Sequence, residues 1–93
     1  MKKILIIEDE SSVRDLIQLI LKRENFEVIT APDGRSGLSA AKSHKPDLII
    51  LDLMLPDMSG YDICKEIFNS SKIPIIMLTA KNEVIDKVLG LES

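Results

Sequence analysis

Runs of consecutive aliphatic residues constrain the fold of this chain more than any other feature. In the run Leu48–Leu51 every residue is apolar, whereas a strand with one face in water would alternate apolar and polar residues. An unbroken run of this kind is typical of a parallel strand that is buried on both faces. The strands that we predict from such runs are Lys3–Glu8, Glu27–Ala31, Leu48–Leu53 and Ile75–Thr79.

Helical patterns separate these strands. After the first strand, apolar residues from Val13 to Leu21 recur every three or four positions, which predicts an amphipathic helix with one buried stripe. Ser11 and Ser12 are candidate N-caps of this helix. The alternation of strands and helices indicates an α/β fold with parallel strands, right-handed crossovers and helices on both faces. The further helices are predicted over about Arg35–Ser43, from Ser59 and Gly60 onward, and from about Glu83 through Leu89.

Composition narrows the possible functions. With 93 residues, 45% of them hydrophobic, the chain fits one small domain. The net charge is -3 and the basic residues are scattered, so we expect this domain itself to bind no nucleic acid. The first apolar run is too short to span a membrane, and acids follow it where a signal peptide has small residues. We therefore expect a cytoplasmic protein with no membrane partner, in which Cys64 is a small core residue.

Polar residues stand where three of the predicted strands end. The first strand ends in Glu8 and Asp9, the third in Asp52 and the fourth in Thr79. Ligands of such sheets bind outside the carboxyl ends of the strands, and if these three strands are neighbours, we expect the three carboxylates and the hydroxyl to converge. Two of these residues also have a purely structural explanation, since Asp9 could stabilise the N-terminus of the first helix and Thr79 could cap the loop before the last one. Asp52 has no such explanation, because no helix is predicted close after it.

Three neighbouring carboxylates favour a cation between them. Like charges raise one another's pKa unless a positive charge joins them, and Mg²⁺ prefers oxygen ligands, including one or two carboxylates and phosphate oxygens. The loop EDESS after the first strand is acidic and lacks glycine, unlike a loop that cradles phosphate directly. The sequence therefore predicts a Mg²⁺ site at this edge of the sheet.

The stretches ILIIEDE, LIILDLMLPDMSGYD and PIIMLTAK together resemble the receiver domain of two-component response regulators. The likeness extends over residues 1–93 and is closest to the transcription-factor class that carries a winged-helix output domain. It implies a flavodoxin-like doubly wound parallel sheet in the order 2-1-3-4, and phosphorylation by a sensor histidine kinase that switches an output, in this class transcription. Such a domain is a phosphoacceptor in signalling rather than an enzyme, apart from its own phosphorylation and dephosphorylation.

The resemblance also implies roles for single residues. Asp52 corresponds to the phosphoacceptor, and the Mg²⁺ ligands correspond to Glu8, Asp9, Asp52 and the backbone carbonyl of Met54, with Glu8 able to act through water. Thr79 is similar to the switch hydroxyl that binds the phosphoryl group, and Ala80 is small enough to leave access to it. The loop residues Pro56 and Gly60 match structural positions of the family.

The chain departs from the family pattern at LGLES, where a fifth strand, a lysine at its tip, a switch aromatic and a fifth helix would follow. Lys81 lies two residues past Thr79 and takes over no role. The resemblance therefore describes a receiver domain without its fifth βα unit. Because the missing lysine would stabilise charge on the phosphoryl group, its loss predicts phosphotransfer that is slower by roughly 10²–10³-fold. The fourth strand would be an open apolar edge, which predicts self-association through that edge.

Two other functions stay open. An aspartate-nucleophile phosphohydrolase also uses an acid at a strand end with Mg²⁺, but such enzymes resemble D-x-D, and here Met54 stands at the place of the second acid. A receiver-shaped interaction module that is not phosphorylated would keep the fold without the chemistry. A phosphorylation assay with a small phosphodonor, read by mass, separates all three functions.

Overall fold

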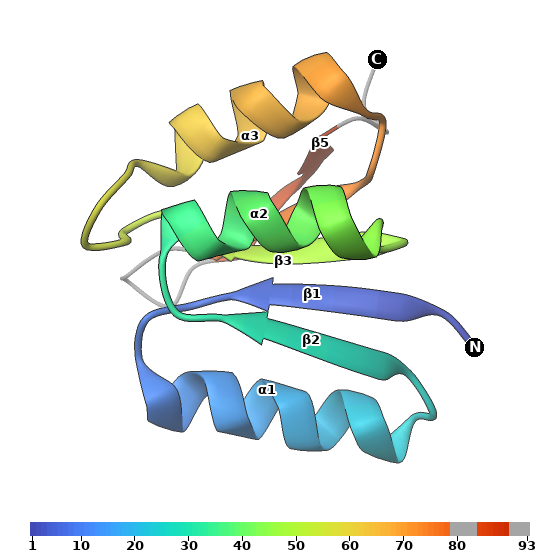
Figure 1. Ribbon diagram of the computed structural model, residues 1–93. Helices are drawn as coiled ribbons and strands as arrows, with labels where there is room; N and C mark the ends of the chain where they lie inside the picture. The colour runs from blue at the N-terminus through green and yellow to red at the C-terminus, as the bar shows by residue number, and fades with distance from the viewer. Residues whose placement is uncertain (79–83, 90–93) are drawn as a thin grey trace.

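A five-stranded sheet in the order β2-β1-β3-β4-β5 forms the centre of the molecule (Figure 1). The computed structural model describes residues 1–78 and the backbone of residues 84–89. The first four strands are parallel, which confirms the predicted order 2-1-3-4. The strands are β1 (Lys3–Ile7), β2 (Glu27–Ala31), β3 (Leu48–Asp52), β4 (Ile75–Leu78) and β5 (Val84–Leu89).

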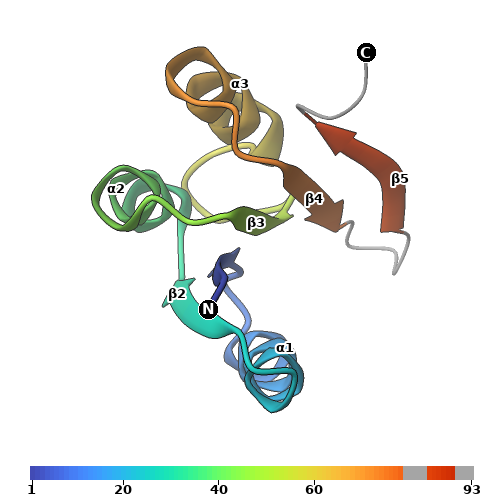
Figure 2. The same ribbon diagram turned by 90° about the vertical axis from the view of Figure 1, so that its right-hand side faces the viewer.

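Helices lie on both faces of the sheet (Figure 2). Helix α1 (Ser11–Arg23) packs against β1 and β2 on one face, whereas α2 (Gly34–His44) and α3 (Gly60–Ser70) lie on the other. The prediction of Ser11 and Ser12 as N-caps is wrong, because Glu10 is the N-cap and both serines are already helical. In the described part of the chain, no helix is long and apolar enough to cross a bilayer.

The main core lies between the sheet and the pair α2 and α3. Alternate strand residues point into it, as the period of two in a strand requires. Cys64 is buried there as predicted, and burial raises the pKa of its thiol to about 11. The buried members of this core are Leu5, Ile7, Ala31, Ala41, Ile49, Leu51, Ile63, Cys64, Ile67, Ile75 and Met77.

The face of the sheet that carries α1 is covered less completely. The predicted apolar stripe of α1 exists in sequence, but Leu16 is 57% exposed and Ile20 51% exposed. Only part of the stripe, including Ile17 and Leu21, is partly buried. The physical reason is that α1 packs on β1 and β2 and therefore buries only the side of the helix that meets those two strands.

The last predicted helix is wrong. Residues Val84–Leu89 form β5, which pairs antiparallel with β4, with Ile75 opposite Leu89 and Leu78 opposite Val84. The apolar spacing fits a helix, but three β-branched residues favour a strand, and the edge of β4 offers backbone groups that need partners. The prediction of an open fourth-strand edge is therefore wrong as well, and self-association through that edge loses its basis.

Candidate functional site

Three acids meet at the carboxyl end of the sheet. Glu8, Asp9 and Asp52 each offer a carboxylate oxygen, and these oxygens lie within 4.8 Å of one another. Their approach follows from strand register, because β1 and β3 are adjacent and parallel, with Ile7 beside Leu51. The residues that follow this pair must then emerge at the same edge. The expected convergence of the three carboxylates is what the structure shows.

Asp52 is the last residue of β3 and is almost fully buried. It pairs with Leu78 of β4, and the next amide, that of Leu53, donates to the Leu78 carbonyl at 3.0 Å. The Met54 amide donates to Asp52 Oδ1 at 3.0 Å. The backbone therefore fixes the carboxylate both at its own strand and through the first turn of the loop that follows.

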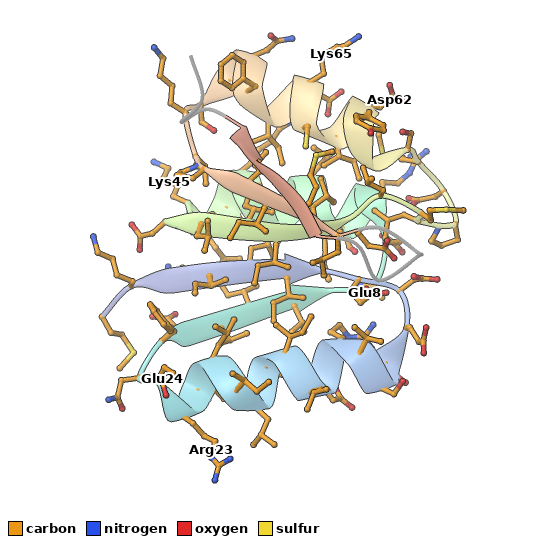
Figure 3. All side chains as sticks on the ribbon, turned by 180° about the vertical axis from the view of Figure 1, so that it is seen from behind. Glu8, Arg23, Glu24, Lys45, Asp62 and Lys65 are labelled. Carbon is orange, nitrogen blue, oxygen red and sulfur yellow. The ribbon has the colours of Figure 1, made fainter. Side chains whose placement is uncertain are left out.

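Glu8 lies immediately after β1 and is also buried (Figure 3). Burial raises the pKa of its carboxyl to about 7, and the neighbouring charge of Asp52 adds to the rise. A hydrogen bond from the Glu10 amide to Glu8 Oε2, 3.0 Å long, opposes the shift without cancelling it. A buried carboxyl group whose ionisation is made costly by burial and by a neighbouring acid is one that a divalent cation would stabilise in its charged form.

The residue types around this cluster fit Mg²⁺. Glu8, Asp9 and Asp52 supply only oxygen ligands, the kind that Mg²⁺ prefers, and of the three Asp9 is exposed. The raised pKa of Glu8 is caused first by burial and then by the charge of Asp52, and a cation beside the carboxylate would counter both effects. This donor set can therefore hold a hard divalent cation.

The acceptor loop consists of residues 53–59 between β3 and α3, and the first residue of α3 after it, Gly60, must be glycine. A Cβ on Gly60 would lie 2.7 Å from the Leu53 Cα and 2.8 Å from the Asp52 carbonyl oxygen, both of which are backbone atoms. Ser59 is the N-cap of α3, and its hydroxyl accepts from the Tyr61 amide at 3.1 Å. Gly60 thus permits the helix to start directly against the strand that carries Asp52. Pro56 is exposed in the same loop.

The predicted switch residues come directly after strand β4 in the sequence. Strand β4 ends at Leu78, which pairs with Asp52, so the end of this strand lies beside the acid cluster. Thr79 and Ala80 follow it and lie outside the described residues.

Two residues near the site were missed in the sequence. Arg14 Nη1 donates to the Glu8 carbonyl at 2.8 Å and to the Asp9 carbonyl at 3.4 Å, which ties α1 to the turn that carries the acidic pair. Asp57 binds the start of α2, far away in sequence. Arg14 stands one turn into a predicted helix and could have been suspected, whereas the partners of Asp57 lie 22 and 23 residues away and leave no local signal.

Four parallel strands in the order 2-1-3-4, with an acidic cluster at their carboxyl ends, define an α/β domain of the flavodoxin-like class. The chain belongs to the response regulator receiver domain family, whose sequence model matches residues 4–93.

Curated relatives are transcriptional regulators by name. The chain is 51% identical over 92 residues to the alkaline phosphatase synthesis transcriptional regulatory protein PhoP of Bacillus subtilis, covering 98% of this chain and 38% of that protein. It is 42% identical over 92 residues to the DNA-binding response regulator MtrA of Mycobacterium tuberculosis, covering 99% of this chain and 40% of that protein. The chain thus spans less than half the length of these relatives.

Solved structures agree on the fold. The response regulator TrrA from Thermotoga maritima, solved in complex with Mg²⁺-BeF, matches with a TM-score of 0.83 at 38% identity, covering 86% of this chain and 70% of that one. The chemotaxis protein CheY4 from Vibrio cholerae matches with a TM-score of 0.83 at 35% identity, covering 89% of this chain and 72% of that one. The flavodoxin-like fold class predicted from the sequence is thereby confirmed.

Proposed function

We propose that this chain is a Mg²⁺-dependent phosphoacceptor domain in which Asp52 receives a phosphoryl group from the phosphohistidine of a sensor kinase. The observation that carries the proposal is the meeting of Glu8, Asp9 and Asp52 at one edge of the sheet. Membership of the receiver family supports the same reading. The proposal takes Asp52 as the nucleophile because it ends the central strand and is held by the Met54 amide.

The proposed metal ligands are Glu8, Asp9, Asp52 and the Met54 backbone carbonyl. A bound Mg²⁺ would neutralise negative charge on the acceptor and on the phosphoryl oxygens. The chain's own contribution is to hold the Asp52 carboxylate in one orientation, since catalysis of phosphoryl transfer depends mostly on positioning and charge. During transfer the bond from phosphorus to the donor nitrogen breaks with its electron pair left on the imidazole, and a bond to an Asp52 oxygen forms.

The remaining roles rest on the family resemblance. In the proposal, the Thr79 hydroxyl binds the phosphoryl group on Asp52 and Ala80 leaves room for it, so phosphorylation biases the segment after β4 between two arrangements. Pro56 and Gly60 shape the acceptor loop. Gly60 has structural support in its close approach to Asp52 and Leu53.

For the whole protein, we propose that this domain controls transcription through an output domain. The support is that PhoP of Bacillus subtilis and MtrA of Mycobacterium tuberculosis are regulators by name and are more than twice as long as the matched region. The proposal includes a sensor histidine kinase as partner and a cytoplasmic location, both of which rest on family membership. It treats residues 1–93 as a receiver domain that acts as a phosphoacceptor.

A phosphodonor assay tests the proposal. The protein is incubated with acetyl phosphate, with Mg²⁺ or with a chelator, and its intact mass is measured over time. We expect a gain of one phosphoryl group that needs Mg²⁺ and is lost in Asp52→Asn. Sustained hydrolysis of a small phosphoester would instead indicate a phosphohydrolase, and no labelling under any condition would indicate an interaction module.

A further inference from the structure

The acceptor loop is held at its base by its own backbone. Met54 and Ser59 form an antiparallel bridge across it, and the Gly60 amide donates to the Leu53 carbonyl at 3.0 Å. These bonds close the loop next to Asp52. They do not reach its tip, where Pro56, Asp57 and Met58 follow one another.

The tip is held by a different element. The carboxylate of Asp57 accepts from the Gly34 amide at 2.8 Å with Oδ1 and from the Arg35 amide at 3.0 Å with Oδ2. Both amides belong to the first turn of α2, whose N–H groups have no acceptor within their own helix. Asp57 therefore supplies half of the capping of a helix that begins 23 residues earlier in the chain.

Close packing accompanies these two hydrogen bonds. A Cβ on Gly34 would lie 2.9 Å from the Met58 Sδ and 2.9 Å from the Ile63 Cδ1. The start of α2 and the tip of the acceptor loop are thus in direct contact, and Gly34 is buried by that contact. The link between Asp57 and α2 joins two packed surfaces.

Helix α2 is itself fixed relative to the other half of the acid cluster. A Cβ on Gly37 would lie 2.6 Å from the Ile7 Cδ1, so the helix backbone rests directly on the residue that precedes Glu8. Asp33 completes the start of the helix, because its Oδ1 accepts from the Ser36 amide at 2.8 Å. The end of β1 and the acceptor loop therefore both contact the same helix, α2.

We propose that Asp57 is a positioning residue for the phosphoacceptor site. By pinning the tip of the acceptor loop to α2, it holds the Met54 carbonyl and the Asp52 carboxylate at a fixed position relative to Glu8. The inference rests on the proposed function, and Asp57 itself contacts neither metal nor phosphoryl group. An aspartate is already ionised at neutral pH, and the hydrogen bond from the Gly34 amide lowers the pKa of Asp57 further.

The test compares Mg²⁺ affinity, measured by calorimetry, with labelling by acetyl phosphate. We expect Asp57→Ala to weaken Mg²⁺ binding by about 10-fold, the lower end of the effect of losing a residue that orients a metal ligand, and to slow labelling. Asp57→Asn keeps one oxygen that can accept from one amide, so we expect it to lose less Mg²⁺ affinity than Asp57→Ala. Two control variants, Asp62→Asn and Asp33→Ala, should keep the Mg²⁺ affinity of the wild type.

The controls separate positioning from stability. Asp62→Asn removes the same charge from a neighbouring exposed site, and Asp33→Ala removes the other cap of α2 while leaving the acceptor loop pinned. Urea unfolding should show that Asp33→Ala loses stability as Asp57→Ala does. Amide hydrogen exchange should become faster in the acceptor loop only in the Asp57 variants.

Each result decides something. If Asp57→Ala is poorly folded, Asp57→Asn carries the comparison. Asp57 variants that bind Mg²⁺ and label like the wild type would overturn the positioning role and leave the proposed function intact. The role is equally overturned if Asp33→Ala weakens Mg²⁺ binding as much as Asp57→Ala. Wild-type protein that neither binds Mg²⁺ nor becomes labelled would overturn both proposals together.

Discussion

Glu8 and Asp52 bring their carboxylate oxygens within 4.8 Å of each other at the ends of two adjacent parallel strands. Both residues are nearly buried, with exposed fractions of only 7% for Glu8 and 9% for Asp52. Two acids this close and this buried are costly when both are ionised. Burial is the main reason that the pKa of Glu8 rises to about 7, and the charge of Asp52 adds to the rise.

Replacing Asp9 or Asp52 with asparagine should weaken Mg²⁺ binding by at least about 10-fold, because each change removes a charged oxygen ligand. Calorimetric titration at neutral pH measures the effect. Asp15→Asn, which removes an exposed acid from α1, is the control for charge alone. Equal Mg²⁺ affinity in the wild type and in Asp9→Asn would show that the metal assignment is wrong.

Without Mg²⁺, the protein should lose stability as the pH rises from about 4.5 to about 7. The pKa of Glu8 is raised on folding, so the folded state binds the proton more tightly, and the stability that this supplies is lost as the pH passes the folded value. At about 1.4 kcal/mol per pKa unit, a rise from 4.5 to about 7 corresponds to at most about 3.5 kcal/mol, and solvent screening of the carboxyl brings the expected change to the order of 2 kcal/mol.

Glu8→Gln tests the origin of that slope, because it removes the titrating group and should flatten the dependence in urea unfolding between pH 5 and pH 8. Adding Mg²⁺ at pH 8 should restore stability to the wild type, since a ligand that binds only the folded state stabilises it. A Glu8→Gln variant with the same pH slope as the wild type would contradict the account of Glu8.

Gly60→Ala should destabilise the fold by about 1–3 kcal/mol, since the added methyl would meet the backbone of Leu53 and Asp52, which cannot rotate away. The relief of the clash would shift Asp52, so Mg²⁺ affinity should fall as well. Chemical denaturation measures the stability. Ser39→Ala, on the exposed side of α2, should change it by less than about 0.5 kcal/mol.

The contribution of Asp57 should disappear in acid. Its pKa is lowered in the folded state, first by the Gly34 amide, so its stabilising effect is present above the unfolded value of 3.8 and is lost as the pH falls below it. The difference in stability between the wild type and Asp57→Asn should therefore be constant near neutral pH and shrink in acid. A difference that persists unchanged into the acid range would rule out ionisation of Asp57 as its source.

The sequence pattern by itself determined that the strands are parallel, and the resemblance to receiver domains supplied their order, from which the meeting of the acids follows. Unbroken aliphatic runs such as Leu48–Leu51 can be buried only between two layers of helices, and that requirement gives parallel strands with crossover helices. Once β1 and β3 are neighbours, Glu8, Asp9 and Asp52 must share an edge, because all parallel strands end on the same side. Local pattern was sufficient for the parallel direction of the strands because burial on both faces leaves few alternatives.

Only the tertiary structure decided the state of residues Val84–Leu89, the exposure of α1 and the anchoring of Asp57. The apolar spacing in Val84–Leu89 fits a helix, and the free edge of β4, which lies outside that segment, provides the hydrogen bonds that make it a strand. Leu16 and Ile20 have the spacing of buried residues, but burial depends on which strands α1 meets. The bonds from Asp57 to Gly34 and Arg35 join residues 22 and 23 positions apart, and a hydrogen bond of that span exists only after the sheet has brought the two loops together.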